Sequence, residues 1–470
     1  MRFHELFSEA INKTGWSKNY ISQTFNINRG TLYKYISGDL FVPKDVFLML
    51  LEKMKIGRAE QDELFEKYFF EYFGSKKINR LRYIQKALSE LDENCLPIKD
   101  FDGSYDDSFD GQKIRCLNSK KDIIACLRYV LKKAGESEIV TNYRYFDKEV
   151  DDAVFQFLSE NKKLNIQHLL VFDKESNSLN NLNNIFGSIR WLRHQINPIY
   201  CYAYKDVVDF IPFPYYFAVD SYCLLFSFKN GCGIYIKDKN VFDDINNSAD
   251  RFIKKSRPLA VFPNSIIDMK NEVLRQVNGT LESAWCMYPC LSIVADEEFI
   301  SSVVRRELPD YELLVKVCVQ HYKSLKSGNQ KNYFSARGLQ MFAKTGRVSE
   351  APAAFLNNAP VEQRLRFFYK LKTLINEGRL MILDDSLFQM PYMVSVSLFG
   401  SAVQILGEFA DIPDELKCAG NYIITLEDRV LESDILDFGE YPCSNRFFYS
   451  AYAAESYVDS LILFCEQIKQ

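Results

Sequence analysis

The chain has 470 residues and a formal net charge of −4, and 47% of its residues are hydrophobic and 14% aromatic. This length predicts about two to four domains, and the composition excludes a disordered protein because it supplies ample apolar side chains for buried cores. Residues 1–15 predict an amphipathic helix rather than a secretory leader, and no run of about 18 apolar residues follows, so we expect a cytoplasmic protein.

The 12 cysteines lack the spacing of a metal site. Cys286 and Cys290 have no cluster of His or Cys after them, and the other cysteines are scattered among apolar residues. We therefore expect reduced thiols in buried cores and a protein without a metal or a cofactor.

A stretch that begins at Ser17 predicts two short helices joined by a tight turn. Ser17 and Asn28 each precede a helix, where a side-chain oxygen can accept a hydrogen bond from an unpaired backbone N–H group. Asn26 and Ile27 supply the turn, and Gly38 ends the second helix. Apolar residues at helical spacing face inward: Ile21, Phe25, Leu32 and Tyr35. The remaining residues of the second helix face outward: Arg29, Gly30, Thr31, Tyr33 and Lys34.

This stretch resembles the helix-turn-helix of phage-repressor and Cro-like (XRE-type) transcriptional regulators, over residues 1–57. The likeness is carried by the pair Ile21-Ser22, then Phe25 and Ile27, the run Asn28-Arg29-Gly30-Thr31-Leu32, then Tyr35, Gly38, Pro43 and an apolar helix from Val46 to Ile56. The sequence departs from the family at Ile36, where an acidic residue is common, and at Gly30, which lowers helix propensity. These departures concern base reading more than the fold.

The resemblance implies a DNA-binding surface in which the second helix enters the major groove. The residues expected to contact double-stranded DNA are Lys18, Asn19, Asn28, Arg29, Thr31, Tyr33 and Lys34. Arg29 and Lys34 would reach base edges or phosphates, and Lys18 and Asn19 would hold the DNA backbone at a helix N-terminus. Two copies on one palindromic site, with half-sites about 34 Å apart, are expected.

The charge distribution agrees with a basic amino-terminal reader. Residues 1–89 carry 15 Lys and Arg against 10 Asp and Glu, a net charge of +5, which leaves −9 for the rest of the chain. This charge is modest, so one copy would bind phosphates weakly and a homodimer is expected.

Three segments are predicted between the helix-turn-helix module of residues 1–57 and the first sheet. Residues 59–73 predict a helix with an aromatic stripe, and residues 78–91 predict a helix with apolar positions spaced by three and four. For the second helix, packing on its own chain and a seam between two copies both remain open. Residues 92–118 predict an acidic linker, whose carboxylates lack the order of a calcium-binding loop.

Beyond residue 118, helices and strands alternate, which predicts an α/β or α+β unit. Helices are predicted at 123–133, 149–161 and 241–255, and strands at 138–143, 166–172, 199–204 and 216–220. Asn230-Gly231 predicts a two-residue hairpin turn.

A helical span and a second alternating unit complete the chain. Helices are predicted at 265–282, 296–307, 310–327, 361–377 and 451–468, strands at 380–383 and 421–426, and a hairpin around Gly400. Residues 333–342 are read as either strand or helix. Both units place a helix before strands, then a hairpin and a terminal helix, which suggests a duplication.

Enzyme motifs are absent from the sequence: it has no phosphate loop, no His-Glu-x-x-His and no Gly-x-Ser-x-Gly. His168 lies in an apolar strand and is expected in the core. His321-Tyr322-Lys323 and the tandem units resemble phospholipase D-like proteins, whose motif is His-x-Lys-x4-Asp in each unit. Gly328 stands where the Asp is needed, and the first unit has no His-x-Lys, so the two-histidine chemistry is not expected. A degenerate phospholipase D-like unit remains an alternative.

We therefore expect a multidomain regulator that binds a specific DNA sequence as a homodimer. Its domains are expected at residues 1–73 (reader), 74–118 (helical and acidic linker), 119–262 (α/β sensor), 263–329 (helical connector) and 330–470 (second α/β domain, for sensing or dimerisation). A small molecule or a protein is the expected effector. Two alternatives remain open: a phage-defence or toxin-like effector with an autoregulatory helix-turn-helix, and an interaction adaptor that does not bind DNA.

Overall fold

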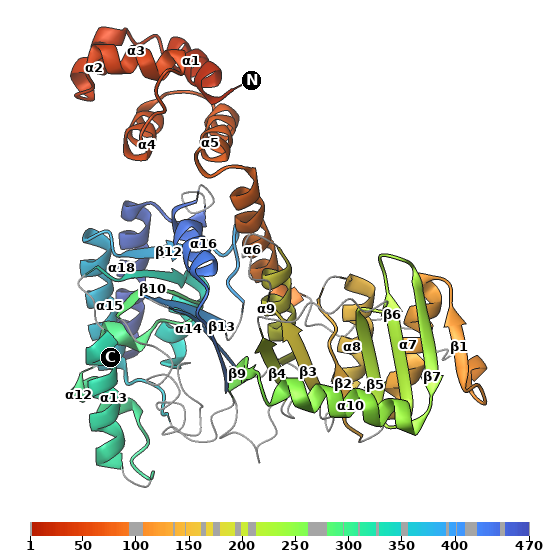
Figure 1. The fold of residues 1–470 in the computed structure, drawn as a ribbon. Helices are drawn as coiled ribbons and strands as arrows, with labels where there is room; N and C mark the ends of the chain where they lie inside the picture. Colours follow the sequence, from red (N-terminus) through yellow and green to blue (C-terminus); the bar gives the residue numbers. More distant parts are fainter. Residues whose placement is uncertain are drawn as a thin grey trace. The chain divides into compact units, whose positions relative to one another are not determined.

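The computed structural model describes residues 2–93, 107–134, 137–145, 147–160, 166–172, 179–192, 199–204, 213–261, 280–294, 296–308, 311–325, 329–348, 356–391, 394–400, 402–408, 421–441 and 447–469. They form two compact units (Figure 1). The helical unit contains residues 1–82 and 437–445, and the α/β unit contains residues 83–436 and 446–470.

The helical unit is built around an aromatic core. Its helices are α1 (Phe3–Lys13), α2 (Lys18–Thr24), α3 (Arg29–Ser37), α4 (Lys44–Lys53), α5 (Arg58–Phe73) and the first part of α6 (Ser75–Glu93). The rings of Phe47 and Tyr68 stack with centroids 4.0 Å apart, and the Tyr68 hydroxyl donates to the Val42 carbonyl at 2.9 Å. Each such buried aromatic side chain stabilises the fold by about 1.5–3 kcal/mol.

The predicted helices of this region are confirmed. The stripe expected on residues 59–73 is buried at Leu64, Phe65, Tyr68 and Phe69, whereas Tyr72 is 49% exposed. Five apolar residues of α6 are buried within the single chain: Ile78, Leu81, Ile84, Leu88 and Leu91. Of the two alternatives for this helix, packing on its own chain is therefore the one observed.

The α/β unit contains two mixed sheets. The first has the order β1-β7-β6-β5-β2-β3-β4-β8. Its strands are β1 (Ile114–Leu117), β2 (Ile139–Thr141), β3 (Ile166–Val171), β4 (Ile199–Tyr204), β5 (Tyr215–Val219), β6 (Tyr222–Ser227), β7 (Cys232–Lys237) and β8 (Arg257–Pro258). Its helices are α7 (Lys120–Ala134), α8 (Lys148–Glu160), α9 (Leu179–Leu192) and α10 (Lys239–Ile253). Ala249 of α10 packs on Val140 and Leu169, and Tyr129 of α7 contacts Tyr235 from the opposite face.

The second sheet has the order β12-β11-β10-β13-β14-β15-β9. Its strands are β9 (Ala260–Val261), β10 (Leu281–Cys286), β11 (Lys331–Ser335), β12 (Leu380–Leu383), β13 (Val394–Phe399), β14 (Ala402–Glu408) and β15 (Asn421–Leu426). Its helices are α12 (Glu297–Val303), α13 (Tyr311–Leu325), α14 (Ala336–Thr345), α15 (Val361–Asn376), α16 (Arg429–Glu440) and α18 (Ala451–Lys469). Buried side chains of α14, α15 and α18 form one core with β10 and β11.

The two sheets share one topology. In each, a central strand (β2 or β10) has two parallel strands on one side, β3 and β4 or β11 and β12. On its other side lie three antiparallel strands, β5 to β7 or β13 to β15. The strand that precedes each unit, β1 or β9, pairs antiparallel with the last of these. The antiparallel bridge from Leu383 to Phe448 matches the β4–β8 pair. This correspondence supports the duplication that the sequence suggested.

The strand register places His168 and Asn332 at equivalent positions of the two repeats. His168 pairs with Thr141, which pairs with Phe217, two residues before the β5–β6 hairpin closes. In the second repeat, Asn332 pairs with Ala284 of the central strand. Ala284 pairs in turn with a residue of β13 that lies two positions before the β13–β14 hairpin closes. Both polar side chains are buried, so the repeats keep a polar group at the same place in their cores.

Three segments differ from the sequence expectation. Ile114–Leu117, expected in the acidic linker, forms the edge strand β1. Leu281–Cys286, expected at the end of a helix and in a helical connector, forms the central strand β10. β10 is buried on both faces along most of its length, so it lacks the alternation that marks a half-exposed strand. The helix α9 was not predicted at all.

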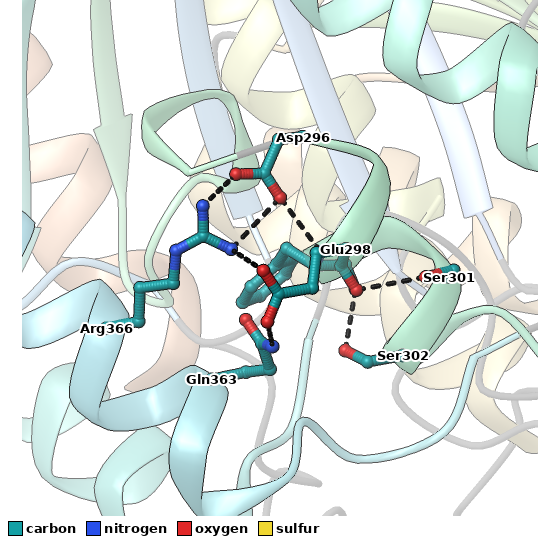
Figure 2. A network of polar contacts seen from close by, with 7 residues as sticks. Asp296, Glu298, Ser301, Ser302, Gln363 and Arg366 are labelled. Carbon is teal, nitrogen blue, oxygen red and sulfur yellow. Dashed lines mark hydrogen bonds and ion pairs between the residues drawn. The ribbon is translucent and has the colours of Figure 1, made fainter.

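A polar network holds α12 against α15 in the second repeat (Figure 2). One guanidinium nitrogen of Arg366 donates to Asp296 and to Glu298, each at 3.2 Å. The Gln363 amide donates to Glu298 at 2.9 Å, and Asp296 caps α12 by accepting from the Phe299 N–H at 2.9 Å. Because these charges are partly exposed, the network adds about 1 kcal/mol or less and mainly fixes the position of α12.

Candidate nucleic-acid interface

The two helices predicted from Ser17 onward are present as α2 and α3, and their caps are confirmed. Ser17 accepts a hydrogen bond from the Tyr20 N–H at 3.1 Å. Asn28 accepts one from the Gly30 N–H at 2.8 Å and a longer one from the Thr31 N–H at 3.4 Å. Gly38 ends α3 with a φ of 83°, a conformation that glycine adopts at little cost. The predicted boundaries of this helix pair are therefore observed.

The inner faces of α2 and α3 form the contact that sets their relative orientation. Ile21 and Leu32 are fully buried, and Tyr35 and Ile27 are nearly so. The Ser22 hydroxyl donates to the Ile27 carbonyl at 2.6 Å and closes the turn, in which Asn26 has a φ of 52°. The pair is thus a packed helix-turn-helix, which leaves the opposite face of α3 free for a partner.

The structure places the seven residues expected to contact DNA on α2, α3 and the turn between them. Five are exposed: Asn19, Asn28, Arg29, Tyr33 and Lys34. Lys18 and Thr31 are partly buried, and Asn28 is also engaged in capping α3. Asn28 therefore has a structural role that is independent of any ligand.

Three of these residues form a cluster that joins the two helices. The Lys18 ammonium nitrogen lies 4.4 Å from the centre of the Tyr33 ring, and the Arg29 guanidinium carbon lies 5.9 Å from it. A hydrogen bond with Arg29 and the positive charges of Lys18 and Arg29 lower the pKa of the Tyr33 hydroxyl. The ring orients both cations, and the two cations make the hydroxyl a stronger hydrogen-bond donor. The cluster can hold an anionic group such as a phosphate.

Residues 10–38 concentrate positive charge. They include Lys13, Lys18, Arg29 and Lys34 and contain neither Asp nor Glu. Lys13 forms an ion pair with Glu60. Lys18, Arg29 and Lys34 therefore give α2 and α3 a positive charge, although Asp39 follows directly after α3.

Two aromatic residues beside this cluster were not assigned a role from the sequence. Tyr20 on α2 is 48% exposed, and its ring lies 5.7 Å from that of Trp16. The Trp16 ring is in turn 5.6 Å from that of Phe25. An exposed aromatic ring next to Lys18 and Asn19 offers a further contact for a sugar or a base. In the sequence, only the position of Tyr20 in the first turn of α2 could have indicated this role.

His168 of the α/β unit occupies a structural environment. His168 is fully buried and hydrogen-bonds the Tyr143 carbonyl at 2.6 Å and the Tyr145 hydroxyl at 3.2 Å. Its ring stacks on Trp191, and burial lowers its pKa to about 4, so it is neutral at physiological pH. This confirms the expected core histidine. His321 and Lys323 lie in α13, and His194 lies outside the described residues.

Within the described ranges, no group of three or more His, Cys, Asp or Glu side chains could hold a metal ion. Over the same residues, no helix combines the length and the apolar character needed to cross a bilayer.

No protein-family model and no curated protein matches the chain. Among solved structures, it is similar to the archaeal chromatin protein TrmBL2, with 14% identity, a TM-score of 0.22, and coverage of 48% of this chain and 87% of that one. It is also similar to phosphatidylserine synthase of Haemophilus influenzae Rd KW20, with 11% identity, a TM-score of 0.25, and coverage of 83% and 98%. A third similarity is to polyphosphate kinase of Porphyromonas gingivalis, with 11% identity, a TM-score of 0.23, and coverage of 69% and 49%. At scores this low, nothing is carried over from these proteins to this chain.

Proposed function

We propose that the helical unit binds double-stranded DNA, with α3 in the major groove and α2 across the phosphate backbone. The observation that carries the proposal is the cluster of Lys18, Tyr33 and Arg29 on the outer face of a capped and packed helix-turn-helix. The absence of acidic residues from 10–38 supports it. The resemblance to XRE-type regulators gives the same orientation of α3.

The full proposal is a transcriptional regulator that acts as a homodimer. Lys18, Arg29 and Lys34 supply few phosphate contacts per copy, so stable occupancy at physiological salt requires two copies on one site. The two α/β repeats are proposed to sense a small-molecule or protein effector or to hold the dimer together. Catalysis is not part of this proposal.

The test is a duplex selected by the purified protein from a random-sequence library, followed by affinity measurements across a salt series. We expect Arg29→Ala/Lys34→Ala to lose most of the affinity and to reduce the slope of log affinity against log salt by about 2, one for each lost phosphate contact. Lys53→Ala/Lys55→Ala is the matched control, since it removes two cations of the same unit outside α2 and α3. Circular dichroism confirms that each variant is folded.

Two results would contradict the proposal. The first is the recovery of no enriched duplex by the wild-type protein, which would favour the adaptor. The second is an equal loss of affinity in the two double variants, because this would show that general charge rather than the surface of α3 binds the DNA.

A further inference from the structure

A segment from the far end of the chain completes the helical unit. Residues 437–445 belong to the same compact unit as residues 1–82. The described part of this segment is the last turn of α16 followed by Tyr441. Phe438 and Tyr441 are only 3% and 4% exposed, so their side chains are part of a core.

The segment is anchored by aromatic contacts and by an ion pair. The Tyr441 ring lies 6.4 Å, centroid to centroid, from the rings of both Phe69 and Phe73 on α5. The Asp437 carboxylate forms an ion pair with Lys77 on α6. The Lys77 ammonium nitrogen is also 5.7 Å from the Phe73 ring centre. Lys77 therefore contacts both Asp437 and one of the rings that pack against Tyr441.

Packed side chains continue from this anchor to the end of α3. Phe69 contacts Phe47 with ring centroids 6.5 Å apart, and Phe47 contacts Phe3 of α1 at 5.3 Å. His4, the next residue of α1, packs against Gly38, where an added Cβ atom would lie 2.7 Å from the imidazole ring. These contacts form a continuous row of packed side chains from α5 to the end of α3.

The chain also links this anchor to the second sheet. Strand β15 ends at Leu426, Asp428 caps α16, and α16 then runs from the α/β unit into the helical unit. The helix α6 crosses the same division after Arg82. The helical unit is therefore connected through helices at two separate places in the chain.

We propose that residues 437–441 are an internal effector segment: their docking on α5 and α6 sets how strongly α3 binds DNA. The inference rests on the proposed DNA binding and adds its regulation. An effector that displaces α16 in the second repeat changes DNA affinity without touching α2 or α3. The coupling is reciprocal, so DNA binding also stabilises the docked segment.

The test compares variants of the full-length protein on the duplex selected by the wild type. Tyr441→Ala is expected to weaken binding about tenfold, whereas Tyr441→Phe, which keeps the ring contacts, retains wild-type affinity. Asp437→Lys is expected to weaken binding, and the charge swap Lys77→Asp/Asp437→Lys to restore it. The swap keeps the net charge of the protein, so recovery reports on the ion pair. Tyr452→Ala is the control, because Tyr452 is 81% exposed on α18.

Hydrogen exchange provides a readout that does not need DNA. Faster exchange of the α1, α3 and α5 amides in Asp437→Lys, with the sheet amides unchanged, is expected. Wild-type affinity in both Tyr441→Ala and Asp437→Lys would overturn the inference and leave the proposed function intact. Failure of the charge swap to restore binding would also overturn it. Absence of any selected duplex for the wild type would remove the proposed function first and this regulation with it.

Discussion

Lys18 at the start of α2 lies 4.4 Å from the ring centre of Tyr33 in the middle of α3. The contact joins the helix proposed to lie over the DNA backbone to the helix proposed to read the groove. The Arg29 guanidinium carbon is 5.9 Å from the centre of the same ring. One aromatic ring therefore contacts two cations without an acidic residue.

Tyr33 is therefore expected to position cations as well as to contact DNA. Tyr33→Phe keeps the ring and should retain most of the affinity, with a loss confined to the hydroxyl contact. Tyr33→Ala removes the ring and should cost about 1 kcal/mol more, roughly a fivefold further loss. Titrations of the selected duplex measure both. Equal affinities of the two variants would show that the ring does not organise Lys18 and Arg29.

Asn28 should matter for stability even in the absence of DNA. Its side chain accepts hydrogen bonds from the Gly30 and Thr31 N–H groups, so Asn28→Ala leaves the start of α3 uncapped. We expect a loss of about 1 kcal/mol in the stability of the helical unit, and near wild-type stability for Asn28→Ser, which can also cap. Urea unfolding followed by circular dichroism checks this. A stability of Asn28→Ala equal to that of wild type would exclude the capping role.

Gly338 is required by a close approach of two backbones in the second repeat. A Cβ atom at this position of α14 would lie 1.7 Å from the Met287 carbonyl oxygen. Gly338→Ala must therefore displace α14 from the end of β10, at an expected cost of about 2 kcal/mol or more. Gly57→Ala is the control, since nothing lies within 4 Å of a Cβ there. It should change stability by less than about 1 kcal/mol. Thermal unfolding measures the stability of both variants. A Gly338→Ala protein as stable as the Gly57→Ala control would contradict the close packing of α14 against Met287.

His168 should make the first repeat less stable as the pH falls. Burial lowers its pKa in the folded protein to about 4, below the value of 6.5 for an unburied histidine. The unfolded chain then binds a proton that the folded protein excludes, so stability is full above about pH 6.5 and is lost as the pH falls toward 4. The loss approaches about 3 kcal/mol.

Asp151 changes the pH dependence in the opposite direction, because burial raises its pKa to about 7 and folding then favours its protonated form. The His168 contribution is therefore measured as a difference between wild type and His168→Gln, whose longer side chain places its amide nitrogen where Nε2 contacts the Tyr143 carbonyl. Unfolding at pH 7.5 and at pH 4.5 should show a larger acid-induced loss in wild type. The same loss in both proteins would show that His168 is accessible to protons in the fold.

The sequence by itself determined the local structure wherever side chains act on their own backbone. Ser17, Asn28 and Gly38 placed the ends of α2 and α3, because caps and a left-handed glycine depend on the nearest few residues. The strand from Asn421 to Leu426 and the presence of a hairpin at Asn230-Gly231 were likewise predicted. The expected two-residue turn was wrong, because Ser227 pairs with Cys232 and the loop between them has four residues. The candidate site could also be predicted from local sequence, because all of its residues lie within one short stretch of chain.

Only the tertiary structure decided which distant segments belong together. The strand β10 carries no alternating pattern, because neighbours bury both of its faces, and its central place in the second sheet follows from long-range pairing. The common topology of the two repeats is a property of strand order rather than of residue identity. The docking of Tyr441 on α5 likewise joins residues far apart in the chain. Such contacts join residues that are far apart in the sequence, so the local sequence around each residue does not predict them.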